Sequence, residues 1–67
     1  MAVHKTIEIM GESDKSWSDA AENVVKAASK SVDGVKSIWV KDQSATVNDG
    51  KIESYRVNCK VTFKIKS

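Results

Sequence analysis

The stretch IESYRVNCKVTFKI, residues 52–65, decides the fold, because its residues alternate almost without a break. One side carries Glu53, Tyr55, Val57, Cys59, Val61, Phe63 and Ile65, and the other carries Ile52, Ser54, Arg56, Asn58, Lys60, Thr62 and Lys64. A period of two is typical of a half-buried β-strand. At about 3.3 Å per residue this strand would extend roughly 45 Å. A chain this short cannot cover the whole strand by itself. We therefore expect the uncovered part of the strand to contact another chain or a ligand.

The size of the chain points to assembly. It has 67 residues, which we interpret as one domain over residues 1–67. A chain of about 60 residues buries only about 60% of its unfolded surface, and such domains usually need disulfides, a metal or oligomerisation. Cys59 is the only cysteine, and Cys59 and His4 are the only soft metal ligands, whereas structural zinc needs about four. Of these three sources of stability, oligomerisation is the one that remains for this chain.

Charge and composition exclude several classes of function. Lys and Arg number 11 and Asp and Glu number 9, a balance that does not predict nucleic-acid binding. No apolar run is long enough to span a bilayer and no signal-peptide pattern is present, so no membrane partner is expected. A single cysteine without an export signal predicts a cytoplasmic protein. The chain has no glycine-rich phosphate loop, no Ser-His-Asp set and no recognisable carboxylate pair, so we expect no enzymatic activity.

The first half of the chain predicts a strand and a helix. Residues 3–10 read as a strand that Gly11 ends, followed by a polar connection. Ser16 is a candidate N-cap with Asp19 three residues on, and Gly34 is a candidate C-cap. Between the caps, apolar residues recur at helical spacing: Trp17, Ala20, Ala21, Val24, Ala27, Ala28 and Val32.

The second half predicts a hairpin. Residues 35–47 form a second strand, and Asn48-Asp49-Gly50 is a strong turn signal before the long third strand. The order β-α-β-β indicates an α+β fold, a three-stranded antiparallel sheet packed on one helix. On this facing, Val61 and Phe63 should be buried against the helical stripe. A helix of about 25 Å would cover only part of the hairpin.

Four segments in order resemble the dodecins, over nearly the whole chain. They are IEIMGES at 7–13, WSDAAENVV at 17–25, SVDGV at 31–35 and YRVNCKVTFKI at 55–65. The resemblance implies a β-α-β-β subunit that assembles into a hollow homododecamer. It also implies a small-molecule ligand, since many dodecins store or sequester flavins.

The departures from the dodecin pattern lie at its flavin site. Ser37 stands where flavin-binding dodecins carry a tryptophan that stacks on the isoalloxazine ring, and Arg56 stands where a glutamine hydrogen-bonds that ring. Ser44 stands where bacterial members often carry an arginine that meets a phosphate. Lys64 keeps a second basic residue near the C-terminus. The pattern is similar to the calcium dodecins, a divergent branch that also lacks the stacking tryptophan. It implies weak or absent binding of riboflavin or FMN and is compatible with a divalent cation such as calcium, for which no ligand residue is assigned.

Two interpretations are open for Trp39 and for Arg56. Trp39 shares a face with Ser37 and could present an aromatic plane near the ligand pocket, but we favour packing between subunits. Arg56 could bind an anionic group, but we favour pairing with a carboxylate on a neighbouring strand or chain. Cys59 is expected to be a buried, structural thiol. The acids Asp14, Asp19, Glu22, Asp33, Asp42 and Asp49 show no EF-hand spacing.

The sequence therefore predicts a non-catalytic, dodecin-like shell that binds, stores or buffers a small ligand. Two alternatives stay open. One is a flavin-storage dodecin that uses Trp39. The other is a structural shell with divalent cations between subunits.

Overall fold

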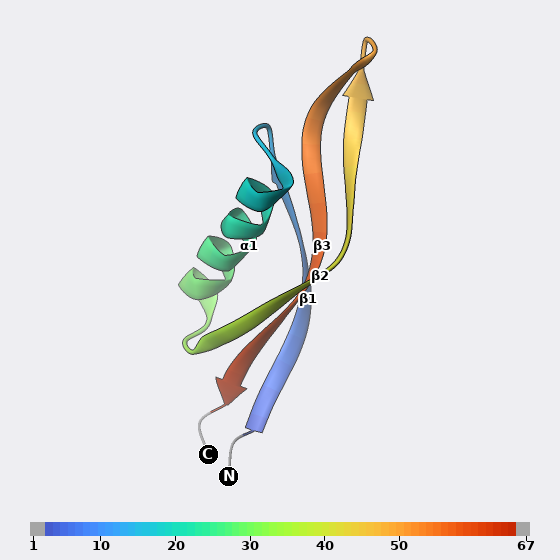
Figure 1. Ribbon diagram of the computed structural model, residues 1–67. Coiled ribbons are helices and arrows are strands. Elements are labelled where there is room, and N and C mark those ends of the chain that lie inside the picture. Colours follow the sequence, from blue (N-terminus) through green and yellow to red (C-terminus); the bar gives the residue numbers. More distant parts are fainter. Residues whose placement is uncertain (1–2, 66–67) are drawn as a thin grey trace.

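The computed structural model describes residues 3–65 and has the predicted β-α-β-β order (Figure 1). The elements are β1 (Val3–Ser13), α1 (Trp17–Ser31), β2 (Val35–Asn48) and β3 (Lys51–Ile65). The three strands form one sheet in the order β1-β3-β2, and both pairings are antiparallel. α1 lies against one face of this sheet, so the predicted α+β class is confirmed. We name the other face, which no helix covers, the open face.

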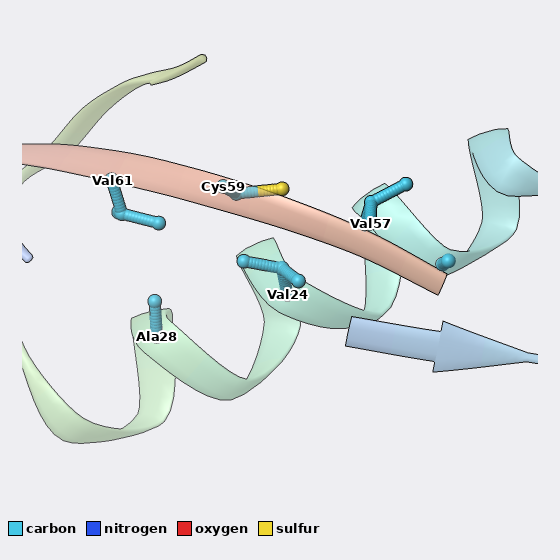
Figure 2. Packing of buried hydrophobic residues seen from close by; sticks show 6 residues of the cluster. Val24, Ala28, Val57, Cys59 and Val61 are labelled. Atoms are coloured by element: carbon cyan, nitrogen blue, oxygen red, sulfur yellow. The ribbon is translucent and has the colours of Figure 1, made fainter. Parts of the chain in front are cut away.

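The alternation in β3 places its apolar side under α1. Val57, Cys59 and Val61 are all 1% exposed or less, and they pack with Ala20, Val24 and Ala28 of the helix (Figure 2). Phe63 is different from the prediction, because it is only half-buried and lies outside this cluster. The helix does not cover the last residues of β3. Phe63 is therefore not a core residue of the protomer.

The helix begins as predicted but ends earlier. The Ser16 side chain accepts a hydrogen bond of 2.9 Å from the Asp19 backbone N–H, which satisfies one of the free donors of the first turn. At the other end the C-cap is Val32 rather than Gly34, whose carbonyl instead accepts from the Lys64 backbone N–H at 3.0 Å. Ala27, predicted to belong to the buried stripe, is exposed. The buried face of the helix is thus narrower than the apolar spacing indicates.

Gly11 does not end the first strand, contrary to the prediction. β1 continues to Ser13, and Gly11 is buried inside it. A Cβ at this position would collide with Val24 Cγ2 and would lie 2.6 Å from the Ala20 carbonyl oxygen. The glycine therefore permits the close approach of strand and helix, which is a known role of glycine within a strand.

The hairpin of β2 and β3 extends well beyond the rest of the protomer. β1 ends opposite Tyr55, so residues 46–54 pair only with each other. We name this segment the arm. At its tip, Asp49 and Gly50 have φ values of 53° and 75°, the two positive values that a type I′ turn needs. The molecule measures 51 × 19 × 13 Å. Within residues 3–65, no helix has the length and apolar character that crossing a membrane takes.

Candidate functional site

The five residues predicted for the ligand site all lie on the open face, but they do not form one cluster. In the β2–β3 register Ser37 pairs with Thr62, and Ser44 pairs with Arg56. Arg56 and Lys64 are eight residues apart on one strand, which corresponds to about 26 Å. A ligand of flavin size therefore cannot contact both ends of this set within one protomer.

Arg56 is paired inside the protomer. Its Nε donates a hydrogen bond of 2.9 Å to Glu12 Oε1 on β1. The Ser54 hydroxyl donates to the same oxygen at 2.9 Å and lies 2.6 Å from the Thr46 hydroxyl. The hydrogen bonds from Arg56 and Ser54 hold the pKa of the Glu12 carboxyl below its usual value. Arg56 thus has the carboxylate partner on a neighbouring strand that the sequence analysis favoured.

Trp39 presents an uncovered aromatic ring between charged groups. The residue is 61% exposed, and the Lys60 ammonium lies 5.2 Å from its ring centroid. Nearby on the same face, Lys41 Nζ is 3.0 Å from Glu8 Oε1. The hydrogen bond from Lys41 lowers the pKa of the Glu8 carboxyl below its usual value. The indole can stack on a flat ring, and Lys60 can meet an anionic substituent.

A shallow hollow lies where β2 begins and β3 ends. It has a volume of about 350 Å³ and is lined by Asp33, Gly34, Lys36 and Lys64. Of the five residues predicted for the ligand site, Lys64 alone belongs to this lining, and Lys36 was not among them. The two ammonium groups outnumber the single carboxylate, so the hollow has a positive balance.

The root of the arm contains a contact that the sequence did not reveal. Trp17 Nε1 donates a hydrogen bond of 2.7 Å to the Ser44 carbonyl oxygen, and the Trp17 ring meets the Tyr55 ring edge-on with centroids 4.8 Å apart. The helical stripe predicted only that Trp17 packs over the sheet. Its partners lie 27 and 38 residues further along the chain, and a local pattern carries no information about them.

We expect Trp17→Phe to lower the free energy of unfolding by about 1 kcal/mol, because an aromatic ring remains while the hydrogen bond to Ser44 is lost. Chemical denaturation at a fixed protein concentration measures the change. Tyr55→Phe is the matched control, since no hydrogen bond of the Tyr55 hydroxyl contributes to this contact and its ring is retained. Equal losses in the two variants would contradict the role of the indole N–H.

Cys59 is a buried thiol, as predicted. Burial, with a smaller effect from the charge of Asp42, raises the pKa of this thiol, which keeps it neutral. Burial therefore disfavours a thiolate at Cys59. Among residues 3–65, no three His, Cys, Asp or Glu side chains gather in a group that could hold a metal ion.

The family model for dodecin matches residues 3–66. The chain belongs to the dodecin family. The calcium dodecin of Mycobacterium tuberculosis is 36% identical over 66 residues, which cover 98% of this chain and 93% of that protein.

Solved dodecin structures share the fold. The crystal structure described as a calcium-chelating immunodominant antigen, calcium dodecin, from Mycobacterium tuberculosis has a TM-score of 0.83 at 40% identity, covering 96% of this chain and 91% of that one. The dodecin from Streptomyces davaonensis has a TM-score of 0.94 at 24% identity, covering 98% and 97%. The second comparison shows the fold alone. The first also places this dodecin in sequence near a relative that is described as binding calcium.

Proposed function

We propose that this dodecin is the subunit of a non-catalytic homo-oligomeric shell, a dodecamer by analogy with its family, that binds and stores a small ligand. We further propose that a divalent cation such as calcium is a better ligand than a flavin. The observation that carries this proposal is the 36% identity to a calcium dodecin over nearly the full length of both chains. We expect such a subunit to act through its binding surfaces.

The residues on the open face support the prediction that a flavin binds only weakly. Ser37, at the position of the family's stacking tryptophan, has no ring to offer. Arg56 has only donors where glutamine has a donor and an acceptor, and its Nε is already bonded to Glu12. A flavin would have to displace this ion pair without gaining an aromatic stack. An aromatic stack is worth about 0.5–1.5 kcal/mol beyond the area that it buries.

A calcium site would have to form between subunits. Calcium takes about six to eight oxygen ligands, and no protomer cluster in the described part of the chain supplies even three acidic groups. Asp14, Glu22, Asp33, Asp42 and Asp49 are all exposed. In a symmetric shell, one such carboxylate repeated around an axis can provide several oxygens at one point.

Binding of both ligands can be compared on the same preparation. We expect calcium to raise the melting temperature of the chelator-treated protein, because a ligand that binds only the folded state stabilises it. Native mass spectrometry of the same sample should give a mass many times the 7.3 kDa of one chain. No change in melting temperature across a calcium titration would contradict the cation, and a monomer would contradict the shell.

We expect riboflavin and FMN to bind at least about tenfold more weakly than to a tryptophan-bearing dodecin, since about 1.4 kcal/mol already corresponds to that factor. Quenching of flavin fluorescence measures the affinity. The double variant Ser37→Trp with Arg56→Gln should restore quenching, and the single variant Arg56→Gln is the control for release of Glu12. Strong quenching by the parent protein would contradict the predicted weak flavin binding and would favour flavin storage.

Flavin storage through Trp39 is the second candidate, and the exposed indole beside Lys60 is the observation that favours it. In this case quenching by the parent should disappear in Trp39→Ala and persist in Trp17→Phe. Loss of quenching in Trp39→Ala alone would identify Trp39 as the residue that stacks on the flavin.

A further inference from the structure

Two rows of the open face place an acid of β1 opposite a base of β3. Glu8 is the register partner of Lys60, and Glu12 is the register partner of Arg56. In the first row the acid is bonded by Lys41 of β2, while the Lys60 ammonium lies over an indole ring. In the second row the acid and the base opposite it bond directly to each other at 2.9 Å. The base of the second row is thus engaged by its own neighbour.

Further contacts hold Glu12 in this position. The Ser54 hydroxyl donates to the same carboxylate oxygen at 2.9 Å and is itself 2.6 Å from the Thr46 hydroxyl. The Glu12 backbone carbonyl accepts a hydrogen bond of 3.0 Å from the Asn23 side chain of α1. Gly11, directly before it, is buried against the same helix. Because a group that is already ordered loses less entropy when it binds, the carboxylate is well prepared to stay beside the guanidinium.

Apart from this bond, Arg56 is well placed to receive an anion. Its side chain is 44% exposed, and its register partner on β2 is Ser44, a small and exposed residue. A guanidinium presents several N–H donors in a planar fork that matches phosphate and carboxylate groups. Glu12 already takes the Nε donor of this fork and compensates its charge. An anion that approaches Arg56 therefore meets a base that is no longer free.

Glu12 competes with such an anion from within the molecule. An exposed ion pair adds little to the stability of a fold. As a competitor the same carboxylate is far more effective, because a group attached to the same molecule acts at an effective concentration of about millimolar. The carboxylate also places a negative charge against the incoming anion, and like charges in contact disfavour binding. Both effects weaken the binding of anions at Arg56.

We propose that Glu12 is a specificity-determining residue: by occupying Arg56, it keeps phosphate-bearing anions off the end of the open face next to the arm. The inference rests on the proposed function, because it concerns which ligands such a shell takes up. It leaves this part of the face to neutral or cationic ligands. If the pair only tied β1 to β3, loss of Glu12 would change the stability of the protein and leave its choice of ligand unchanged. Ligand choice therefore distinguishes a specificity role from a structural one.

Calorimetric titration of pyrophosphate into the chelator-treated protein tests this role. Pyrophosphate carries phosphoryl groups without a ring, so the missing aromatic stack does not affect the result. We expect Glu12→Gln to bind pyrophosphate at least about tenfold more tightly than the parent protein. A guanidinium released from its carboxylate can form charge-assisted hydrogen bonds to phosphoryl oxygens, and about 1.4 kcal/mol already gives that factor. Glu22→Gln removes the same charge from an exposed position on α1 and should bind pyrophosphate like the parent protein.

Two further variants assign the gain in affinity to Arg56. The double variant Glu12→Gln with Arg56→Gln should lose this gain and return to the affinity of the parent protein. The two lysines of the hollow, Lys36 and Lys64, are present in every variant, so any binding there is a common background. Glu12→Thr, whose β-branched side chain suits a strand, should show the same gain and provides the measurement if Glu12→Gln fails to fold.

Equal affinities of the parent protein and the Glu12 variants for pyrophosphate would overturn the proposal. A gain that survives the loss of Arg56 would also overturn it, because another group would then bind the anion. The same holds for a gain that Glu22→Gln shares, since net charge alone would explain it. A calcium titration that leaves the melting temperature unchanged would instead refute the proposed cation and not the role of Glu12, because the pyrophosphate titrations contain no divalent cation.

Discussion

Gly11→Ala is expected to lower the free energy of unfolding by about 3 kcal/mol, at the upper end of the usual cost of overpacking. The added Cβ would collide with Val24 Cγ2 and lie 2.6 Å from the Ala20 carbonyl oxygen. The side chain of Val24 could adapt at some cost, but the Ala20 oxygen belongs to the helix backbone. Strand and helix would have to separate, which loosens the whole core. Urea denaturation at a fixed protein concentration measures the loss.

The double variant Gly11→Ala with Val24→Ala is the control for this mechanism. Val24→Ala removes the Cγ2 atom, so the two changes should be less costly together than the sum of their separate costs. The contact with the Ala20 oxygen remains, so recovery should be partial. Strict additivity of the two free-energy changes would show that Val24 is not the side chain that Gly11 accommodates.

Val61→Ala is expected to cost about 2–3 kcal/mol. Val61 is fully buried, and removing two carbon atoms loses about 0.8 kcal/mol for each together with the cost of the cavity left behind. Val40→Ala is the matched control, because Val40 lies on the neighbouring strand opposite Cys59 but is 37% exposed. Its loss should be clearly smaller under the same conditions. Equal losses would contradict the position of the core under α1.

The fold follows from patterns that are local in the sequence. The alternation through Val57, Cys59 and Val61, the Ser16 cap and the Asp49-Gly50 turn each concern residues a few positions apart, and the structure confirms all of them. The errors occur where tertiary contact overrides a local rule. Gly11 permits a close approach of two elements instead of ending a strand, and Phe63 lies beyond the reach of the helix.

The candidate site was less accessible from the sequence. The resemblance to dodecins gave positions on the open face, but it gave no partner for any of them. The bonds of Arg56 to Glu12 and of Trp17 to Ser44 join residues 44 and 27 positions apart. Such pairs depend on the register of the sheet and on the docking of the helix, which a single sequence does not specify. A site between copies depends in addition on the symmetry of the assembly.

The strand order β1-β3-β2 has a consequence for how the chain folds. The strand at the centre of the sheet is the third to leave the ribosome, so β1 has no partner until β3 is made. Val3 and Ile65, which pair in the finished sheet, are separated by nearly the whole chain. The hairpin of β2 and β3 closes a short loop, whereas β1 closes a long one at a greater entropic cost. During synthesis, the apolar sides of β1 and α1 therefore stay uncovered until β3 is made. Early contact between nascent chains is a risk of this topology.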